Sequence, residues 1–364
     1  MKDLVFITVQ PSDTYYTWQV NMWLESAREF GYSDKAQVLI YNPDNRILDK
    51  EWENLFSRYT ESKFFIYDDS SLRNLLGIYI PILRPFTLAK HFKKYPELKE
   101  KAIFYCDSDI IFTKPLDIDK YKDDDVNYLS DTISYVGGDY LESKINDVIP
   151  SKLETYKKRD IIGELGAISG IGRDVIMNNK HNAGGAQYLL KNIDSDFWME
   201  VFNSTINIRI HLLAVNKQFF ISEDTGFQSW CADMWGVFHT LLRFEKEVKV
   251  VKEMDFSHAT DDISRLQQVS IYHNAGISSD CKIKRRSDKK DIDCPAFYKG
   301  KYIDKSPFQS IDELIEMSKN EDLQQFCNSF YLQKLIELSK KYNQPGNTSV
   351  FLKWHCLEQA GQVC

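Results

Sequence analysis

The fold follows from one stretch of sequence, Phe104-Tyr105-Cys106-Asp107-Ser108-Asp109-Ile110-Ile111-Phe112, in which Asp-Ser-Asp interrupts an apolar run. Two acids spaced two residues apart in an extended chain point to the same side, because the side chains of a strand alternate. Burying two like charges together is costly unless a cation neutralises them, and the apolar flanks disfavour a solvated surface turn. We therefore expect Asp107 and Asp109 to hold a divalent cation, Mn²⁺ or Mg²⁺, at the carboxyl end of a strand.

The residues before this stretch predict a β-α-β unit. Leu4–Val9 is apolar and β-branched, as in a buried parallel strand. Residues 15–30 carry apolar side chains on one helical face, and Gln37–Tyr41 is a second strand. A further helix is expected over residues 81–95, followed by a strand over residues 101–106. This order predicts an α/β fold with a mostly parallel sheet flanked by helices.

The second half of the chain is expected to be more helical. The pattern predicts loop or strand over residues 163–172, a short helix over residues 186–192 after Gly184-Gly185, and a long helix within residues 224–243. The amphipathic pattern from Ile311 to Tyr342 predicts a helical C-terminal extension. The expected division is one α/β domain over residues 1–300, with the extension, residues 301–364, packed on it.

Composition limits the class of protein. The 364 residues are 43% hydrophobic and carry a net charge of −7, which excludes a disordered chain and argues against nonspecific nucleic-acid binding. One basic cluster, over residues 282–290, leaves a local nucleic-acid contact open. No apolar run is long enough to span a membrane.

The short apolar run near the N-terminus does not resemble a signal peptide. The seven cysteines form no CxxC pair and indicate a reduced protein. The expected location is cytoplasmic, the host cytoplasm if the protein is viral. Composition gives no indication of oligomeric state.

The Asp-Ser-Asp stretch resembles the DxD motif of nucleotide-sugar glycosyltransferases with the GT-A fold. Further segments resemble the hydroxyproline O-arabinosyltransferases and peptidyl-serine galactosyltransferases, in the same order along the chain. They are Tyr15–Gln19 (similar to a YxxWQ opening), Leu83–Phe86 (similar to Asn-Arg-Pro-Trp), Ile110–Leu116 (similar to an apolar run ending in Pro-Leu) and Ala232–Gly236 (similar to Glu-Met-Tyr-Gly).

This resemblance spans about residues 1–280. It implies a GT-A-like (Rossmann-like) fold and metal-dependent transfer of a pentose or hexose from a nucleotide sugar, UDP-linked, to an acceptor hydroxyl. The acidic motif of those plant enzymes is less regular than Asp107-Ser108-Asp109, so acceptor specificity is not carried over. A hydroxymethylated DNA base, a protein and a glycan all remain open as acceptors.

Two other functions compete with this interpretation. The phosphotransferases of the haloacid dehalogenase family also place DxD after a strand. Their motif has Thr or Val where this chain has Ile111, and it usually lies nearer the N-terminus. A sugar-binding module without turnover is the other alternative.

The resemblance also suggests residues that complete the site. GT-A enzymes often supply a C-terminal histidine as a metal ligand, and His273, between a strand-like run and Asn-Ala-Gly, is the candidate, with His258 as its rival. A Gly-bearing segment that touches the donor sugar in GT-A enzymes is matched by Asn182, Gly184 and Gly185, for which an ordinary turn is the alternative.

Asp233 is the candidate catalytic base, because it lies between Trp230 and Trp235 in an apolar, aromatic segment. Such surroundings favour the proton-bound form of a carboxyl group and suit a base that acts near neutral pH. Glu223 and Asp224 are its rivals.

Donor-binding residues are expected just after the first strand and at the start of the helix over residues 81–95. Arg84 is a candidate for the donor diphosphate, because a guanidinium binds phosphate with two parallel hydrogen bonds. Trp18 and Gln19 are candidates for lining the nucleotide site, although Trp18 fits the hydrophobic core equally well.

Overall fold

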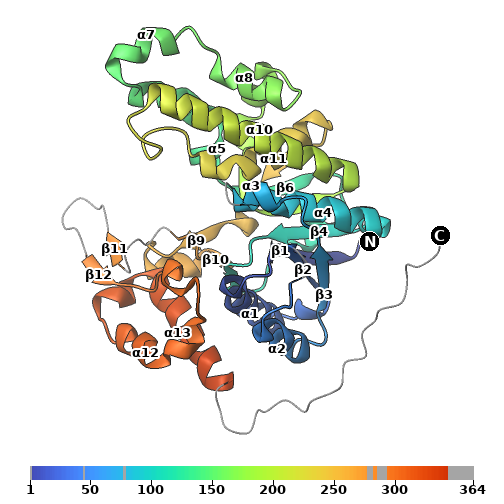
Figure 1. Ribbon diagram of the computed structural model, residues 1–364, viewed down its shortest axis with the longest axis vertical. Helices are drawn as coiled ribbons and strands as arrows, with labels where there is room; N and C mark the ends of the chain where they lie inside the picture. Colours follow the sequence, from blue (N-terminus) through green and yellow to red (C-terminus); the bar gives the residue numbers. More distant parts are fainter. Residues whose placement is uncertain (1, 44–45, 77–78, 277–281, 285–292, 343–364) are drawn as a thin grey trace.

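A seven-stranded sheet organises the molecule (Figure 1). The computed structural model describes residues 2–43, 46–76, 79–276, 282–284 and 293–342. The strand order is β3-β2-β1-β4-β7-β6-β8, and β7 alone runs antiparallel to its neighbours. The expected mostly parallel sheet is therefore confirmed. The strands are β1 (Leu4–Pro11), β2 (Ala36–Asn42), β3 (Lys63–Asp68), β4 (Ala102–Cys106), β6 (Asn127–Asp131), β7 (Gly184–Lys191) and β8 (Val248–Val250).

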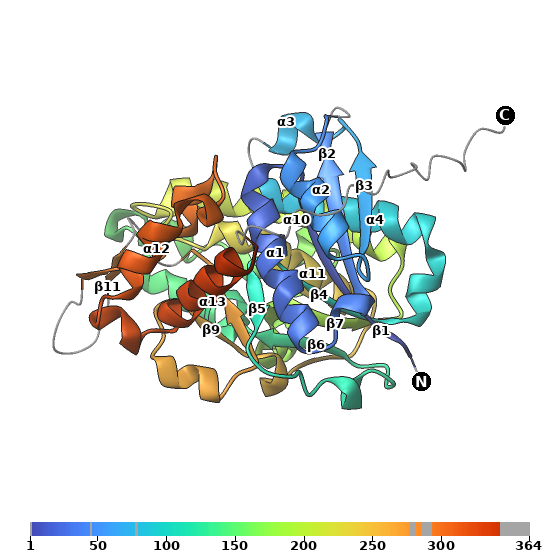
Figure 2. The ribbon, with the colours of Figure 1, turned by 90° about the horizontal axis from the view of Figure 1, so that it is seen from below.

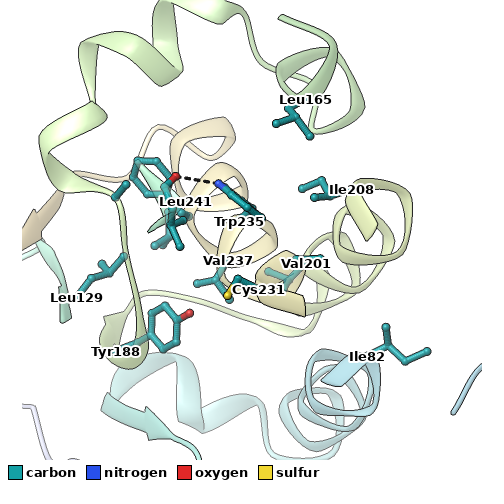
Figure 3. Packing of buried hydrophobic residues seen from close by; sticks show 14 of the residues in the cluster. Ile82, Leu129, Leu165, Tyr188, Val201, Ile208, Cys231, Trp235, Val237 and Leu241 are labelled. Carbon is teal, nitrogen blue, oxygen red and sulfur yellow. Dashed lines mark hydrogen bonds between the residues drawn. The ribbon is translucent and has the colours of Figure 1, made fainter. Parts of the chain in front are cut away.

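Helices cover both faces of this sheet, because successive strand residues point to opposite sides. On β1, Phe6 packs with α1 (Thr14–Glu29) and α2 (Lys50–Arg58). Its neighbour Ile7 belongs to the core under α4 (Leu83–Lys94), α10 (Ser195–Phe219) and α11 (Ala232–Arg243). Figure 3 shows this second core, where Trp235 of α11 faces α10.

Several short helices occur outside these layers. α3 (Arg73–Leu76) follows β3, and five more lie between β6 and β7. These five are α5 (Ile133–Val136), α6 (Gly138–Ser143), α7 (Leu153–Tyr156), α8 (Ile161–Ile168) and α9 (Arg173–Asn178). None of the helices in the described ranges has the length and apolarity needed to cross a membrane.

A second, three-stranded sheet carries residues of the candidate metal site. It consists of β5 (Ile110–Phe112), β10 (Ile271–His273) and β9 (Phe256–His258). β5 pairs antiparallel with β10, which places Ile110 opposite His273, and β9 pairs parallel with β10. Because β5 resumes directly after Asp107-Ser108-Asp109, this pairing brings His273 beside the two acids.

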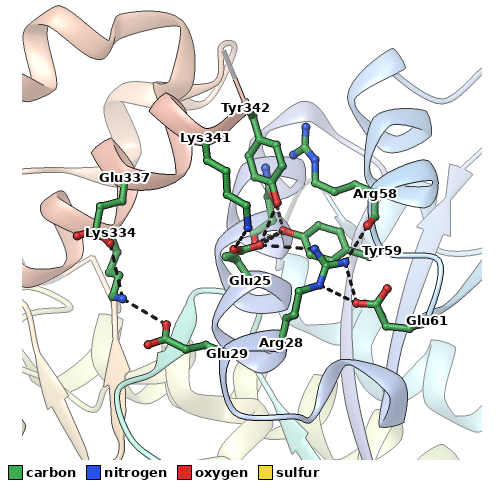
Figure 4. Close-up of polar contacts among 11 residues, drawn as sticks. Glu25, Arg28, Glu29, Arg58, Tyr59, Glu61, Lys334, Glu337, Lys341 and Tyr342 are labelled. Atoms are coloured by element: carbon green, nitrogen blue, oxygen red, sulfur yellow. Dashed lines mark hydrogen bonds and ion pairs between the residues drawn. The ribbon is translucent and has the colours of Figure 1, made fainter. Parts of the chain in front are cut away.

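The C-terminal helices α12 (Ile311–Ser318) and α13 (Cys327–Tyr342) pack on the α/β body. Their apolar side chains share a cluster with Trp18 and Met22 of α1. At the surface, α13 lies beside α1 (Figures 2 and 4), where Lys341 pairs with Glu25. A helical C-terminal region is thus confirmed, and the domain boundary at residue 300 stays a prediction.

Two expectations for secondary structure were wrong. Residues 184–191 form strand β7 and not a short helix, because pairing with β4 and β6 overrides the helix-forming residues Ala, Gln and Leu. Residues 161–168 are helix α8 and not loop or strand, whereas the helix expected within residues 224–243 is present as α11, which begins at Ala232. The 25-residue α10 was not predicted, because its many β-branched residues obscure the helical pattern.

Some expectations fall partly outside the described residues. Cys106, Cys231 and Cys327 are free thiols and Cys294 is buried, whereas Cys281, Cys356 and Cys364 are not described. Of the basic cluster, only residues 282–284 are placed, as strand β11 (Lys282–Lys284), which pairs with β12 (Asp293–Pro295).

Candidate metal and donor site

Two carboxylates and one imidazole converge at the carboxyl end of β4. Asp107 and Asp109 follow β4, and His273 ends β10. One ligand atom from each lies within 4.8 Å of the others. His273 Nε2 is 3.2 Å from Asp109 Oδ1 and 3.8 Å from Asp107 Oδ2. The three residues that the sequence assigned to the metal are therefore neighbours in space.

The polar atoms of this cluster fit a divalent cation. Asp109 and His273 are 8% and 5% exposed. Apart from the His273 imidazole at 3.2 Å, Asp109 Oδ1 has no hydrogen-bond partner among the described residues, and His273 Nδ1 is buried without one. The backbone N–H of Asn274 donates to the Asp109 carbonyl at 2.9 Å, which fixes the His273 segment against the acidic turn. A buried carboxylate oxygen without a hydrogen bond is costly, and a hard cation offers it a partner.

The two carboxylates differ in their electrostatic surroundings. Burial raises the pKa of Asp107, and the Asp109 charge adds to this effect, while the Arg84 guanidinium opposes it. Burial also acts to raise the pKa of Asp109, but Lys299 and His273 hold it well below its ordinary value. Asp109 is thus ionised already, and Asp107 would benefit most from an added positive charge.

Arg84 connects the metal residues to Asp233. Its Nη1 atom is 2.8 Å from Asp107 Oδ1 and 3.1 Å from Asp233 Oδ2. The Tyr79 hydroxyl donates to Asp233 Oδ1 at 3.1 Å. Arg84 lies in the first turn of α4 and Asp233 in the first turn of α11. Packing of these helices against the sheet therefore brings together three predicted residues from distant parts of the chain.

The surroundings of Asp233 differ from those expected. Its carboxylate contacts a guanidinium and a phenol, and Trp235 is buried in the core, where its indole N–H donates to the Val136 carbonyl at 2.8 Å. Trp230 is 59% exposed. The two aromatic flanks therefore differ in their surroundings, because Trp235 lies on α11 two residues beyond Asp233, whereas Trp230 lies in the short 3-10 turn before that helix.

Lys299 is a site residue that the sequence did not indicate. Its ammonium pairs with Asp109 Oδ2, and the side chains of the pair are 18% and 10% exposed. No spacing or motif connects residue 299 to residue 109, so only the folded chain reveals the contact. Tyr15, at the start of α1, also lies near this pair: burial raises its pKa, and the Asp109 charge raises it further.

The remaining predicted donor residues lie in packed positions. The Trp18 ring packs edge-on against Phe297 at 5.7 Å, which is the core alternative left open by the sequence. Gln19 is buried, and its side chain donates to the Tyr15 carbonyl at 2.8 Å. Asn182 lies in the turn before β7, and its N–H donates to the Asn179 carbonyl. Their contact with a donor stays a prediction.

Gly184 and Gly185 allow close packing at the start of β7. A Cβ at Gly185 would lie 2.7 Å from Met234 Cγ, and one at Gly184 would lie 2.5 Å from Leu129 Cβ. Met234 is the neighbour of Asp233 on α11. Gly185 therefore lets α11 pack closely on β7, and Gly184 lets β6 do so. A strand follows these glycines, so no helix N-terminus is present there to bind a ligand.

The rival residues are less well placed. His258 lies beside His273 on the parallel strand β9, with ring centroids 6.4 Å apart, but it is not one of the three converging ligands. Burial and the neighbouring His273 lower the pKa of His258 to about 4, so its imidazole is neutral near pH 7. Glu223 and Asp224 are exposed in the segment between α10 and α11.

No family model matches the chain, and no curated protein matches its sequence. Among solved structures it is similar to the bifunctional glycosyltransferase WbbM in its apo form. The identity is 10% and the TM-score 0.41, over 76% of this chain and 46% of that one, so it spans less than half of WbbM. It is also similar to apo mouse xyloside xylosyltransferase 1, at 10% identity and a TM-score of 0.37, over 75% of this chain and 98% of that one. Likenesses this distant carry no argument about activity.

Proposed function

We propose that this chain is a metal-dependent glycosyltransferase that moves a sugar from a nucleotide sugar to an acceptor hydroxyl. The observation that carries the proposal is the convergence of Asp107, Asp109 and His273 at the carboxyl end of a central strand, next to Arg84 and Lys299. Three cation ligands beside two cationic side chains suit a diphosphate, since its oxygens can contact all of these groups. The resemblance of the sequence to arabinosyl- and galactosyltransferases favours a UDP-linked donor.

Each residue has a proposed role. Asp107, Asp109 and His273 hold Mn²⁺ or Mg²⁺, which supplies positive charge to stabilise the departing nucleotide diphosphate. Arg84 and Lys299 release their carboxylate partners in part and donate to the diphosphate oxygens. Asp233 accepts the proton of the acceptor hydroxyl, and Tyr79 keeps its carboxylate oriented.

The alternatives fit these contacts less well. In a phosphotransferase of the dehalogenase type, the first acid of the motif attacks phosphorus. Here Asp107 Oδ1 is 2.8 Å from the Arg84 guanidinium, which also pairs with Asp233, and Ile111 stands where that family has Thr or Val. A sugar-binding module without turnover does not require a carboxylate such as Asp233 linked through Arg84 to the metal ligands. A measurement of donor turnover distinguishes such a module from an enzyme.

A donor screen tests the proposal. UDP-sugars carrying pentoses and hexoses are incubated with the protein and Mn²⁺, Mg²⁺ or EDTA, and UDP release is measured. We expect release only with a divalent cation, and a loss of at least about a hundredfold in Asp109→Asn, because one charge-stabilising ligand is removed. Asp174→Asn, an exposed aspartate on α9, is the matched control. Cation-independent release, or equal activity of the two variants, would refute the assignment.

A further inference from the structure

A cleft of about 480 Å³ opens between the end of β6, helix α5 and the connection from β9 to β10. Its lining includes Asp131 and Tyr135 on one side and His258, Asp261 and Arg265 on the other. None of these residues holds the proposed metal or donor. The cleft is therefore separate from the metal and donor residues.

One ring contact and one electrostatic interaction connect this cleft to the metal residues. The His258 ring lies 6.4 Å from the His273 ring at an interplanar angle of 30°. On the other wall, burial raises the pKa of Tyr135, and the charges of Asp131 and Asp107 add to that rise. Tyr135 is thus within electrostatic reach of both the cleft and the metal carboxylate. A ligand in the cleft would lie against the metal site without occupying it.

The charge of the lining is strongly negative. Four aspartates and one arginine line the cleft. The single guanidinium, that of Arg265, is held by Asp255 and by the Gln268 side chain. A polyanion such as DNA would meet repulsion here, with no uncommitted cation among the lining residues to receive a phosphate.

Two of these aspartates are fixed in orientation and keep an oxygen available. Asp131 Oδ1 accepts the Ile133 backbone N–H at 3.0 Å, and Asp261 Oδ2 accepts the His258 backbone N–H at 2.8 Å. The second oxygen of each carboxylate makes no hydrogen bond within the described part of the chain. Ionised carboxylates form strong hydrogen bonds with hydroxyl donors, and an uncharged sugar presents several such donors in one small molecule.

We propose that this cleft binds the acceptor and that the acceptor is an uncharged carbohydrate and not a nucleic acid, an inference that rests on the proposed function. In the transfer, a bond forms between the acceptor oxygen and the anomeric carbon, and the bond from that carbon to the diphosphate oxygen breaks. The electron pair leaves with the nucleotide diphosphate, and the hydroxyl proton passes to Asp233. Asp131 and Asp261 orient the acceptor through hydroxyl groups that do not react.

Binding without turnover is the direct test. Saturation-transfer NMR is recorded on the whole protein with Mn²⁺ replaced by diamagnetic Mg²⁺ and UDP present, using xylobiose, lactose, cellobiose and maltose as uncharged probes. A hydroxymethylcytosine-containing duplex is the anionic probe, followed by fluorescence anisotropy at 50 and 150 mM salt. We expect at least one disaccharide to bind, and its dissociation constant to rise about tenfold in each of Asp131→Asn and Asp261→Asn. Asp174→Asn serves as the control for loss of a remote carboxylate.

The outcomes separate this inference from the proposed function. Disaccharide binding that is weakened in both cleft variants but not in the control supports the cleft assignment, even if no donor is turned over. Two results would overturn the cleft assignment while the donor is still turned over: no disaccharide binds, or neither cleft variant weakens the binding. In both cases the proposed donor site is unaffected. Salt-dependent binding of the duplex, with transfer onto it, would also overturn it.

Discussion

Replacing Lys299 by Met should make the stability of the protein depend more strongly on metal than that of the wild type does. Removing one partner of a buried ion pair typically costs about 3–5 kcal/mol, because the other charge is left uncompensated. The Lys299 and Asp109 side chains are 18% and 10% exposed, and His273 Nε2 still lies 3.2 Å from Asp109. Since the imidazole keeps part of the compensation, we expect a loss of about 2–3 kcal/mol in the free energy of unfolding in EDTA.

A divalent cation should restore most of this loss, because it neutralises the same carboxylate and stabilises the folded state by mass action. The assay is urea unfolding of wild type and Lys299→Met in EDTA and in millimolar Mn²⁺, followed by tryptophan fluorescence. Lys301→Met is the matched control, because Lys301 forms an exposed pair with Glu313 and its loss should cost at most about 1 kcal/mol in either condition. Equal destabilisation of Lys299→Met with and without Mn²⁺ would refute the reasoning.

Three further perturbations test the site and its support. Asp233→Asn keeps the shape of the side chain but removes the base, so transfer should fall by about two to four orders of magnitude while UDP binding by calorimetry persists. Gly185→Ala should cost about 1–3 kcal/mol in urea unfolding, because its Cβ would lie 2.7 Å from Met234 Cγ. Burial lowers the pKa of His91 to about 3 from an ordinary value of 6.5. Between these two pH values the imidazole binds a proton in the unfolded chain but not in the folded one. The free energy of unfolding should therefore fall by about 1.4 kcal/mol for each pH unit as the pH decreases through this range.

Each of these expectations has a contradicting result. Near wild-type transfer by Asp233→Asn would make Asp233 structural, and Glu223 or Asp224 would be replaced next. Gly172→Ala meets no atom within 4 Å, so a similar loss in both glycine variants would show that packing on α11 is not the cause. In His91→Gln, an acid slope as steep as that of wild type would assign the slope to other groups.

The sequence predicted the first half of the fold well, because its strands and helices have regular apolar patterns. Leu4–Val9 and Lys101–Cys106 are recognisable as buried strands from their apolar runs, and the structure pairs them in parallel. β7 was missed because Gly184–Lys191 lacks β-branched residues and owes its conformation to pairing with β4 and β6. Local propensity cannot show a pairing between strands about eighty residues apart.

The site residues that could be predicted from the sequence are those whose neighbours along the chain form a recognisable pattern. Asp107 and Asp109 stand out from an apolar run, and His273 from a strand end followed by Asn-Ala-Gly. Lys299 and Tyr79 were missed, since each acts through a contact with a residue more than 150 positions away. The aromatic flanks of Asp233 were misleading, because a helix separates neighbours in sequence onto different faces.

The contact between Lys299 and Asp109 has a consequence for how the protein is made. Residues 2–131 already supply five of the seven strands and both acids of the motif, whereas the histidine and the lysine that face those acids emerge from the ribosome more than 140 residues later. During synthesis, the nascent chain therefore carries Asp109 without Lys299 and His273, whereas Arg84, the partner of Asp107, is already present. The ammonium and the imidazole that face Asp109 join it only once residues 273–299 have been made, so the acidic turn reaches its buried arrangement only after that segment.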